Sequence, residues 1–237
     1  MFNKKLILPV VAVAITAFGL MSLNNRAMAQ QQQEFVSVED GGFKIAGEPY
    51  HYTGINLWYA MNLGAKAPGG NRERLIRELD MLDSLGVDNL RIMAGSEGPN
   101  SEPWSVKPAV QPEPGEYDER LLKGLDFALA EMEKRDMRGV LVLNNFFQWT
   151  GGMAQYVAWA TGEEIPYPNT GEHTWDEFMR YSARFYAIEE AKHLFYDFIE
   201  KLVTRKNTVT GEEYKNDPTI MAWQLANEPR GFQNSDE

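Results

Sequence analysis

The stretch Gly139-Val140-Leu141-Val142-Leu143 is apolar at every position that carries a side chain. A strand with apolar side chains on both faces is typical of a parallel sheet that is covered by helices. The residues before it recur at the three-and-four spacing of a helix packed on one side: Leu121, Leu125, Ala128 and Met132. We therefore predict a helix followed by a buried strand in this part of the chain.

The same alternation extends in both directions from this strand. Towards the amino terminus the pattern predicts short strands at 35–38 and 43–45, a strand at 50–55, a helix at 71–85 and a strand at 87–93. Towards the carboxyl terminus it predicts one long helix over 176–205, a short excursion at 208–214 and a strand at 220–226. Repeated strand–helix units specify a parallel α/β sheet with right-handed crossovers.

Such a sheet can be doubly wound or closed into a (β/α)8 barrel. The segments that follow strands, residues 94–116 and 145–175, are long and rich in Trp, Tyr, Pro, Gly and Glu, whereas those that follow helices are short. Barrel enzymes build their sites from the loops after the strands. The glycine-rich phosphate motifs of nucleotide-binding sheets are missing from the sequence. We predict a (β/α)8 TIM barrel, of which this chain holds about the first four β/α units.

The composition limits the classes of ligand. The 237 residues are 43% hydrophobic and 24% charged, as expected of a globular protein. A net charge of −11 argues against binding to nucleic acid or to an anionic membrane, because both need a basic surface. The sequence has no cysteine, and its three histidines show no metal-ligand spacing. We therefore predict no metal and no cofactor.

The first residues have the features of an export signal. Lys4 and Lys5 precede an apolar run over 6–23, and Ala27-Met28-Ala29 matches a small-x-small cleavage site. We expect a signal peptide at 1–29, a polar spacer at 30–34 and a catalytic-domain portion at 35–237. The alternative is an uncleaved membrane anchor, since the run is long enough to span a bilayer. The expected location is extracellular, without a membrane partner after cleavage.

The strongest chemical signal is Trp223-Gln224-Leu225-Ala226-Asn227-Glu228-Pro229, where the last predicted strand ends. A carboxyl group at the mouth of a barrel, beside an amide that can bond a hydroxyl, suits proton transfer to a glycosidic oxygen. Glu228 is thus the candidate proton donor, with Asn227 beside the substrate. The alternative is that Asn-Glu-Pro is an ordinary turn.

Two neighbouring strands end in polar residues as well. Arg91 lies within the apolar strand at 87–93, and a buried arginine needs a carboxylate partner because it cannot lose its charge. We expect it to face an acidic site, with a structural ion pair as the alternative. Asn144 and Asn145 follow the strand at 139–143, and their amides could bond a sugar or cap the next loop.

Aromatic residues gather in the loops after the strands. Flat aromatic faces pack well against the C–H faces of sugar rings, so the set favours a carbohydrate ligand. Each residue taken singly is more often a packing residue. The set includes Trp58, Tyr59, Trp104, Phe146, Phe147, Trp149, Tyr156 and Trp159.

These motifs together resemble the endo-β-1,4-mannanases of glycoside hydrolase family 5, which are (β/α)8 barrels that hydrolyse mannans with retention. The matching stretches span the chain from residue 54 to residue 229. They are Gly54-Ile55-Asn56-Leu57-Trp58-Tyr59, Leu90-Arg91-Ile92, Glu97-Gly98-Pro99, Gln111-Pro112-Glu113-Pro114-Gly115-Glu116-Tyr117, Leu143-Asn144-Asn145-Phe146, Gly151-Gly152-Met153-Ala154-Gln155-Tyr156 and the Asn227-Glu228-Pro229 segment.

The resemblance implies roles for individual residues. Glu228 would be the general acid/base, Asn227 would bond the sugar beside the cleaved bond, and Arg91 would hold the nucleophile carboxylate. Trp58, Asn144, Asn145 and Trp149 would complete the substrate-binding set. Phe147 departs from the family, whose members commonly have a second Trp at this position. The expected partner is a β-mannan polysaccharide or oligosaccharide.

The resemblance also implies that part of the machinery is missing. A retaining glycosidase needs two carboxyl groups about 5–5.5 Å apart, and the family's nucleophile is a glutamate at the end of the seventh strand. The chain ends at Glu237 after four predicted strands, so we expect the nucleophile to lie beyond it and the chain alone to be inactive. The alternatives are a cellulase-like β-1,4-glycanase and a non-catalytic carbohydrate-binding fragment.

Overall fold

The computed structural model describes residues 34–231 of the chain. The expected signal peptide at 1–29, together with residues 30–33 of the expected spacer, lies outside the described residues. Within the described part, no helix is both long and apolar enough to cross a membrane.

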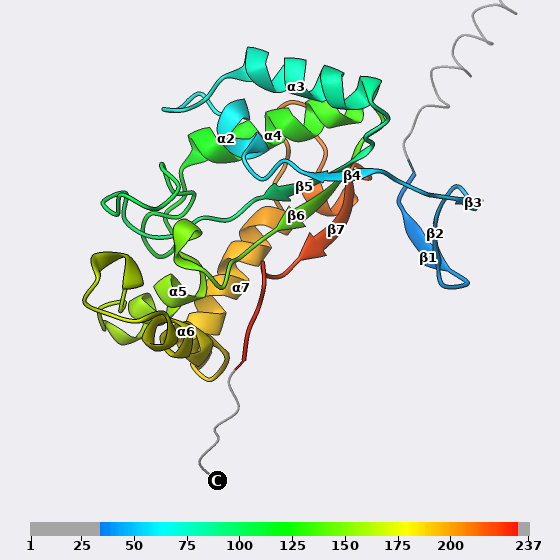
Figure 1. The fold of residues 1–237 in the computed structure, drawn as a ribbon. Coiled ribbons are helices and arrows are strands. Elements are labelled where there is room, and N and C mark those ends of the chain that lie inside the picture. Colours follow the sequence, from blue (N-terminus) through cyan, green and yellow to red (C-terminus); the bar gives the residue numbers. More distant parts are fainter. Residues whose placement is uncertain (1–33, 232–237) are drawn as a thin grey trace, which may run out of the picture. The chain divides into compact units, whose positions relative to one another are not determined.

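The described residues form two sheets. A small antiparallel sheet contains β1 (Ser37–Glu39), β2 (Gly42–Ile45) and β3 (Glu48–Pro49). The main sheet is parallel, in the order β4 (Gly54–Asn56), β5 (Asn89–Met93), β6 (Arg138–Val142) and β7 (Ile220–Gln224). Figure 1 shows these four strands side by side in the middle of the main unit. The prediction of a parallel sheet of four strands is confirmed.

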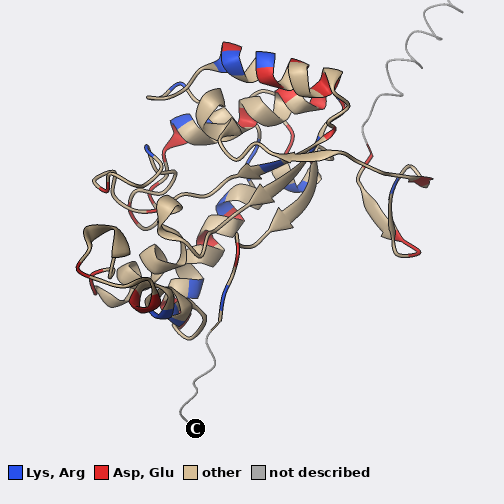
Figure 2. Ribbon diagram, in the orientation of Figure 1, with Lys and Arg blue, Asp and Glu red and all other residues tan. Residues whose placement is uncertain are grey.

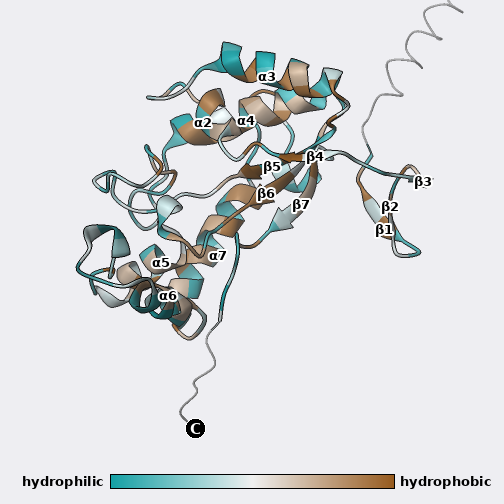
Figure 3. Ribbon diagram, in the orientation of Figure 1, coloured by the Kyte–Doolittle hydropathy of each residue, from teal (hydrophilic) through white to brown (hydrophobic). Residues whose placement is uncertain are grey.

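The two faces of the parallel sheet differ in burial. Leu90, Ile92 and Leu141 are fully buried on the face that packs against helices, and Figure 3 shows the hydrophobic colour of β5 and β6. On the other face, the register aligns Asn56 with Arg91 and Arg91 with Val140. Side chains in register on adjacent parallel strands point to the same face. On the face opposite its helical cover the sheet therefore places the polar pair Asn56 and Arg91 beside the apolar Val140.

Among the described residues, three helices precede β6: α2 (Ala60–Gly64), α3 (Arg72–Ser84) and α4 (Glu119–Glu133). The side chain of Asn71 accepts a hydrogen bond from the Arg74 amide and so caps α3. Leu75, Leu79 and Leu82 form its buried face, as the spacing predicted. Charged residues occur along the exposed length of α3, whereas the strands of the main sheet carry few of them (Figure 2).

Helices α2 and α4 approach each other through two glycines. A Cβ atom added to Gly124 would lie 2.3 Å from the carbonyl oxygen of Met61, and one added to Gly64 would lie 2.2 Å from that of Gly124. Because both neighbours are backbone atoms, the helices would have to move apart to admit a methyl group.

We expect Gly124→Ala to lower the free energy of unfolding by about 1–3 kcal/mol, because overpacking forces backbone shifts. Gly231→Ala is the matched control, since no atom lies within 4 Å of a Cβ added there. Urea unfolding of the two variants measures the difference. A Gly124→Ala variant as stable as the control would show that the helices are not in close contact.

The prediction of a single long helix over residues 176–205 is wrong. The structure has α6 (Trp175–Ala183), a 3₁₀ turn η3 (Arg184–Tyr186) and α7 (Glu189–Val203). Phe185 in the turn is buried against Tyr156 and Phe195. This burial preserves the three-and-four spacing of apolar residues across the break, which is why periodicity alone did not reveal it.

The segment 145–175 was predicted as a loop and instead contains a further helix. It holds the 3₁₀ turns η1 (Gln148–Thr150) and η2 (Pro168–Thr170) on either side of α5 (Gly152–Thr161). Residues 152–157 are all buried. A helix that is buried all round has no apolar stripe, so the helical period is weak in its sequence. A last 3₁₀ turn, η4 (Tyr214–Asn216), precedes β7.

A buried ion pair joins α4 to the segment after α7. The carboxylate of Asp126, which is fully buried, accepts two 2.8 Å bonds from Arg205, one of 2.6 Å from the Tyr214 hydroxyl and one of 2.7 Å from the Thr208 hydroxyl. Burial by itself raises the pKa of Asp126, but the hydrogen bonds from Arg205, Tyr214 and Thr208 outweigh it and lower that pKa. The ion pair is thus a fully hydrogen-bonded unit in the core.

Candidate active site

A cleft of about 360 Å³ lies at the carboxyl ends of the parallel strands. It receives side chains from all four strand ends: β4, β5, the loop after β6 and the loop after β7. Sites of this kind are typical of barrels, where the loops after the strands meet. We call it the strand-end cleft; it is lined by Asn56, Trp58, Arg91, Met93, Phe147, Trp149, Asn227 and Glu228.

Arg91 is the centre of the polar contacts in this cleft. Its guanidinium donates to the side-chain oxygens of Gln224 at 2.8 Å, Asn227 at 2.9 Å and Asn56 at 3.3 Å. Burial lowers the pKa of Arg91, and the charge of Glu228 partly opposes that shift. Among the described residues, Arg91 forms no ion pair; its hydrogen-bond partners are the three amides. The structure thus places amides where the sequence suggested a carboxylate.

Asn227 is held from two sides. Its side-chain oxygen accepts from Arg91, and its Nδ2 donates to the side-chain oxygen of Asn145 at 3.0 Å. Its backbone amide donates to the carbonyl oxygen of Asn144 at 2.8 Å. These bonds join the loops after β6 and β7. They also fix the orientation of the Asn227 amide within the cleft.

Asn144 and Asn145 themselves lie beneath the cleft and do not line it. Both are fully buried. The side-chain oxygen of Asn144 accepts a hydrogen bond from the backbone N–H of Asn145. The side-chain oxygen of Asn145 accepts one from the backbone N–H of Phe147 at 3.1 Å. Both side-chain amides therefore hold backbone N–H groups of the loop that follows β6. A contact of either amide with a sugar stays a prediction.

Glu228 lies in the loop after β7 and lines the strand-end cleft. Its side chain is 60% exposed, and Arg230 Nη2 lies 3.4 Å from its Oε2. The backbone φ of Glu228 is 46°, a left-handed conformation that is uncommon for a residue with a side chain. Such strained positions concentrate at functional sites. The structure brings Glu228 together with Arg91, Asn227 and the cleft tryptophans.

Aromatic rings form one wall of the cleft. The rings of Trp58 and Trp149 meet edge to face with centroids 5.4 Å apart. Phe147 also lines the cleft, and the Arg230 guanidinium lies 5.1 Å from its ring centroid. Asn56 and Met93 were not singled out from the sequence; their positions at the ends of two strands are the signal that could have identified them.

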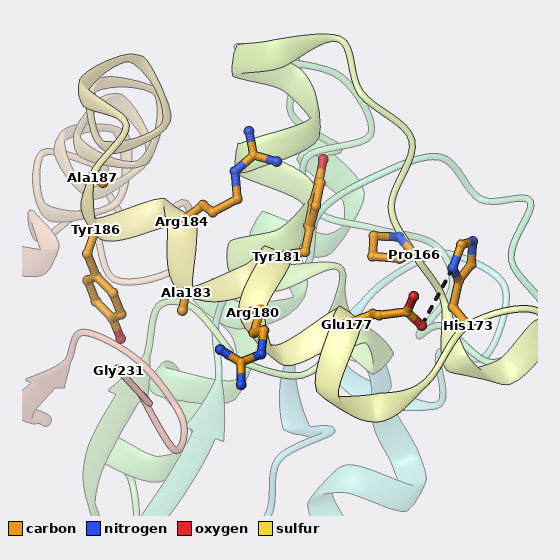
Figure 4. A pocket seen from close by; sticks show the side chains of 10 residues that line it. All are labelled: Pro166, His173, Glu177, Arg180, Tyr181, Ala183, Arg184, Tyr186, Ala187 and Gly231. Carbon is orange, nitrogen blue, oxygen red and sulfur yellow. Dashed lines mark ion pairs between the residues drawn. The ribbon is translucent and has the colours of Figure 1, made fainter. Parts of the chain in front are cut away.

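A larger cleft of about 970 Å³ lies beside α6 (Figure 4). We call it the α6 cleft; it is lined by Pro166, His173, Glu177, Arg180, Tyr181, Ala183, Arg184, Tyr186, Ala187 and Gly231. Its charged groups have partners: Arg184 pairs with Glu163, and His173 Nδ1 lies 3.9 Å from Glu177 Oε2. None of the side chains predicted to be functional lines it. The strand-end cleft is therefore the better candidate despite its smaller volume.

The described residues contain no group of three or more His, Asp or Glu side chains that could hold a metal ion. Within residues 34–231, the strand-end cleft offers one carboxyl, one guanidinium, two amides and an aromatic wall. This set can bind a neutral polyol, and it can donate or accept a proton at Glu228.

Comparison with known proteins gives consistent matches. Residues 33–237 match the family model described as GH family 5 beta-mannosidase-like. Mannan endo-1,4-beta-mannosidase 1 of Solanum lycopersicum is 34% identical over 212 residues, which are 90% of this chain and 48% of that protein. The chain thus spans about half the length of the curated relatives that it matches.

Solved structures show the same relationship. A glycoside hydrolase family 5 mannosidase from Rhizomucor miehei is 46% identical, with a TM-score of 0.79 over 83% of this chain and 49% of that one. An endo-β-1,4-mannanase from Thermotoga petrophila is 27% identical, with a TM-score of 0.58 over 78% of this chain and 36% of that one. These relatives are (β/α)8 barrels, and the four parallel strands correspond to about half of that fold. The chain belongs to the β-mannosidase-like group of glycoside hydrolase family 5.

Proposed function

We propose that the whole protein hydrolyses internal β-1,4-mannosidic bonds of mannans, glucomannans and galactomannans with retention, and that this chain supplies its general acid/base, Glu228. The observation that carries the proposal is the meeting of Glu228, Asn227 and Arg91 in one cleft with an aromatic wall. The proton of Glu228 would go to the leaving glycosidic oxygen, and the resulting carboxylate would then activate water.

Retention needs a second carboxyl group about 5–5.5 Å from the first. Glu228 is the only acidic side chain that lines the cleft within residues 34–231, so the nucleophile in this proposal comes from outside the described residues. Arg91 would orient that carboxylate, since it presents its guanidinium in the same cleft. Without a nucleophile, the described residues alone would bind mannan and not cleave it.

The test has two parts. The whole protein is assayed for release of reducing ends from β-1,4-mannan, with carboxymethyl-cellulose as the comparison substrate. The chain itself is titrated with mannohexaose and with cellohexaose by calorimetry. Hydrolysis of mannan together with preferential binding of mannohexaose supports the proposal. Preference for the cellulose substrates would favour the cellulase-like alternative instead.

A second candidate is an exo-acting β-mannosidase. It is favoured by the 46% identity to the Rhizomucor mannosidase, a variant of which was solved in complex with mannosyl-fructose. An exo-acting enzyme releases mannose from the chain end, whereas an endo-acting one lowers the viscosity of mannan before mannose accumulates. Product analysis over the first minutes of the reaction separates the two.

The aromatic wall gives a prediction for binding. We expect Trp149→Ala to weaken binding of mannohexaose by at least about tenfold, because tryptophan anchors in recessed sites contribute strongly to affinity. Tyr196→Ala is the control, since Tyr196 is 54% exposed on α7 and outside the cleft. Equal affinities of the two variants would remove Trp149 from the binding site.

We also propose that the protein is secreted after removal of residues 1–29, which would bring it to its polysaccharide substrate. The net charge of −11 supports a neutral ligand over nucleic acid. Amino-terminal sequencing of the protein recovered from culture medium tests the cleavage site.

A further inference from the structure

Glu97 is a buried acidic residue that the proposed chemistry does not use. It lies in the loop after β5, is 4% exposed and does not line the strand-end cleft. Within the described residues it has no ion-pair partner among the lysines, arginines and histidines. Burying a carboxyl group without a cation is costly unless hydrogen bonds compensate. We therefore expect hydrogen bonds to stabilise the buried carboxyl group of Glu97.

One set of contacts reaches the loop after β6. Glu97 Oε2 accepts a 2.9 Å hydrogen bond from the Gly152 amide, and the Glu97 amide donates to the carbonyl oxygen of Thr150 at 2.6 Å. A Cβ atom on Gly151 would lie 1.9 Å from the Glu97 carbonyl oxygen. Glu97 therefore contacts three consecutive residues that directly follow Trp149 in the sequence.

The contact with Gly152 also completes a helix end. Helix α5 begins at Gly152, and its N-cap residue Gly151 has no side chain to accept a bond from the first turn. The first amides of a helix need an outside acceptor. Glu97 supplies one such acceptor from a different loop, for the Gly152 amide, and the carbonyl oxygen of Asn145 accepts from the Met153 amide at 2.8 Å. The first turn of α5 therefore depends in part on this carboxyl group.

The other carboxyl oxygen belongs to a short chain of polar groups. The Tyr156 hydroxyl lies 3.5 Å from Glu97 Oε1 and 3.1 Å from Gln111 Oε1. If Glu97 is ionised, the single hydroxyl proton of Tyr156 faces two acceptors. If Glu97 is protonated, it can donate to Tyr156, which donates to Gln111, and every oxygen has a donor. With the Gln111 amide oriented as it is in the structure, a neutral Glu97 therefore satisfies all of these oxygens.

The direction of the pKa shifts of Glu97 and Tyr156 agrees with a neutral Glu97. Burial raises the pKa of Glu97 to about 8, against the lowering effects of the Gly152 and Tyr156 hydrogen bonds. Burial also raises the pKa of Tyr156 well above its ordinary value, with the charges of Glu97 and Tyr117 adding to the shift. Tyr156 and, beyond it, Tyr117 are the titratable groups that face Glu97 in the described part of the chain.

We propose that Glu97 is a positioning residue whose buried carboxyl group locks the loop after β6 in the conformation that holds Trp149 in the strand-end cleft. The consequence for sugar binding rests on the proposed function, whereas the consequence for the loop does not. Gln at this position keeps a neutral group with one acceptor and one donor, so it should preserve the lock. Ala removes both.

Hydrogen–deuterium exchange of peptides covering residues 148–153 tests the proposal in the wild type, Glu97→Gln and Glu97→Ala. We expect exchange in Glu97→Ala to be about ten- to a hundredfold faster than in the wild type, because buried donors lose their partner. Glu97→Gln should stay within about twofold of the wild type. Glu116→Ala, an exposed glutamate of the same loop, is the control and should leave the rate unchanged. Unchanged exchange in Glu97→Ala would overturn the proposal, as would equally fast exchange in both Glu97 variants.

A pH series keeps the proposal testable if Glu97→Ala does not fold. Raising the pH from 7 to about 9.5 should ionise Glu97 and speed exchange of the wild-type segment beyond the intrinsic pH effect, whereas Glu97→Gln should show the intrinsic effect alone. Identical pH dependence in the two proteins would contradict the role of the neutral acid. If the loop responds as expected but no variant binds mannohexaose, the proposed function fails while the positioning role stands.

The raised pKa of Glu97 also predicts that the stability of the folded protein depends on pH. The folded-state pKa of about 8 lies above the ordinary value of 4.5, so between these values the folded protein holds a proton that the unfolded chain has lost. The stability contribution is therefore complete below about pH 4.5 and is lost as the pH rises to about 8. As the pH rises through this window, the ratio of the folding equilibrium constant of Glu97→Gln to that of the wild type should increase by up to about tenfold per pH unit. A constant ratio across the window would contradict a raised pKa.

Discussion

Glu228→Gln is expected to lower kcat for mannan hydrolysis by the whole protein by about 10²–10⁴-fold, the usual contribution of a positioned general acid/base. Gln keeps the size of the side chain but cannot release a proton to the glycosidic oxygen. Binding of mannohexaose should change little, because the 60% exposed side chain makes one long polar contact within residues 34–231, with Arg230. Glu116→Gln is the control, an exposed glutamate outside the cleft.

The leaving group separates loss of acid catalysis from general damage. An aryl mannoside with a weakly basic phenolate departs without protonation, so its cleavage to the glycosyl-enzyme should survive in Glu228→Gln far better than mannan hydrolysis does. Hydrolysis of the glycosyl-enzyme should then be slow, because the same carboxylate serves as the base. If both substrates lose activity equally, Glu228 does not act as the proton donor.

Asp126→Ala is expected to lower the free energy of unfolding by about 3–5 kcal/mol, because removing one partner of a buried ion pair leaves the other charge uncompensated. Arg205 is only 8% exposed and would lose both of its hydrogen bonds to Asp126. The hydroxyls of Tyr214 and Thr208 would lose their acceptor as well.

Glu119→Ala is the matched control for this ion pair. Glu119 also contacts Arg205, at 3.0 Å, but its side chain is 47% exposed, so its loss should cost only about 0–1 kcal/mol. Urea unfolding of both variants gives the comparison. Because the pKa of Asp126 is lowered in the folded state, its contribution is present above the ordinary carboxyl pKa and is lost in acid as the pH falls through the lowered value. Equal destabilisation by the two variants would contradict the difference in burial.

The sequence predicted β6 well because a strand buried on both faces leaves a short, wholly apolar run. The stretch at 139–143 and the observed β6 agree within one residue. The strand expected at 50–55 shares only Gly54 and Ile55 with the exposed β4. The spacing of apolar residues gave wrong helix predictions where tertiary packing determines the backbone conformation. Residues 152–157 of α5 are all buried and so show no apolar stripe, while Phe185 preserves the helical spacing through a turn that is not α-helical. Both errors arise from contacts between segments distant in sequence.

Some of the site residues could likewise be predicted from the sequence, and others could not. Arg91, Asn227 and Glu228 could be predicted as candidates because polar residues at the ends of parallel strands must meet at one edge of the sheet. For Asn144 and Asn145 the sequence could not separate a sugar contact from a cap, and the structure places both under the loop. Their contact with substrate stays a prediction without support from the cleft lining. The burial of Glu97 gave no local signal, because it depends on Gly151, Gly152 and Tyr156 more than fifty residues away.

The most direct test of the account is a crystal structure of the protein with mannohexaose bound, using Glu228→Gln to prevent turnover. We predict sugar rings against Trp58 and Trp149, with the side-chain amide of residue 228 about 2.6–3.2 Å from a glycosidic oxygen. A mannohexaose molecule seated instead in the α6 cleft, with residue 228 facing only solvent, would contradict the assignment of Glu228 as the proton donor.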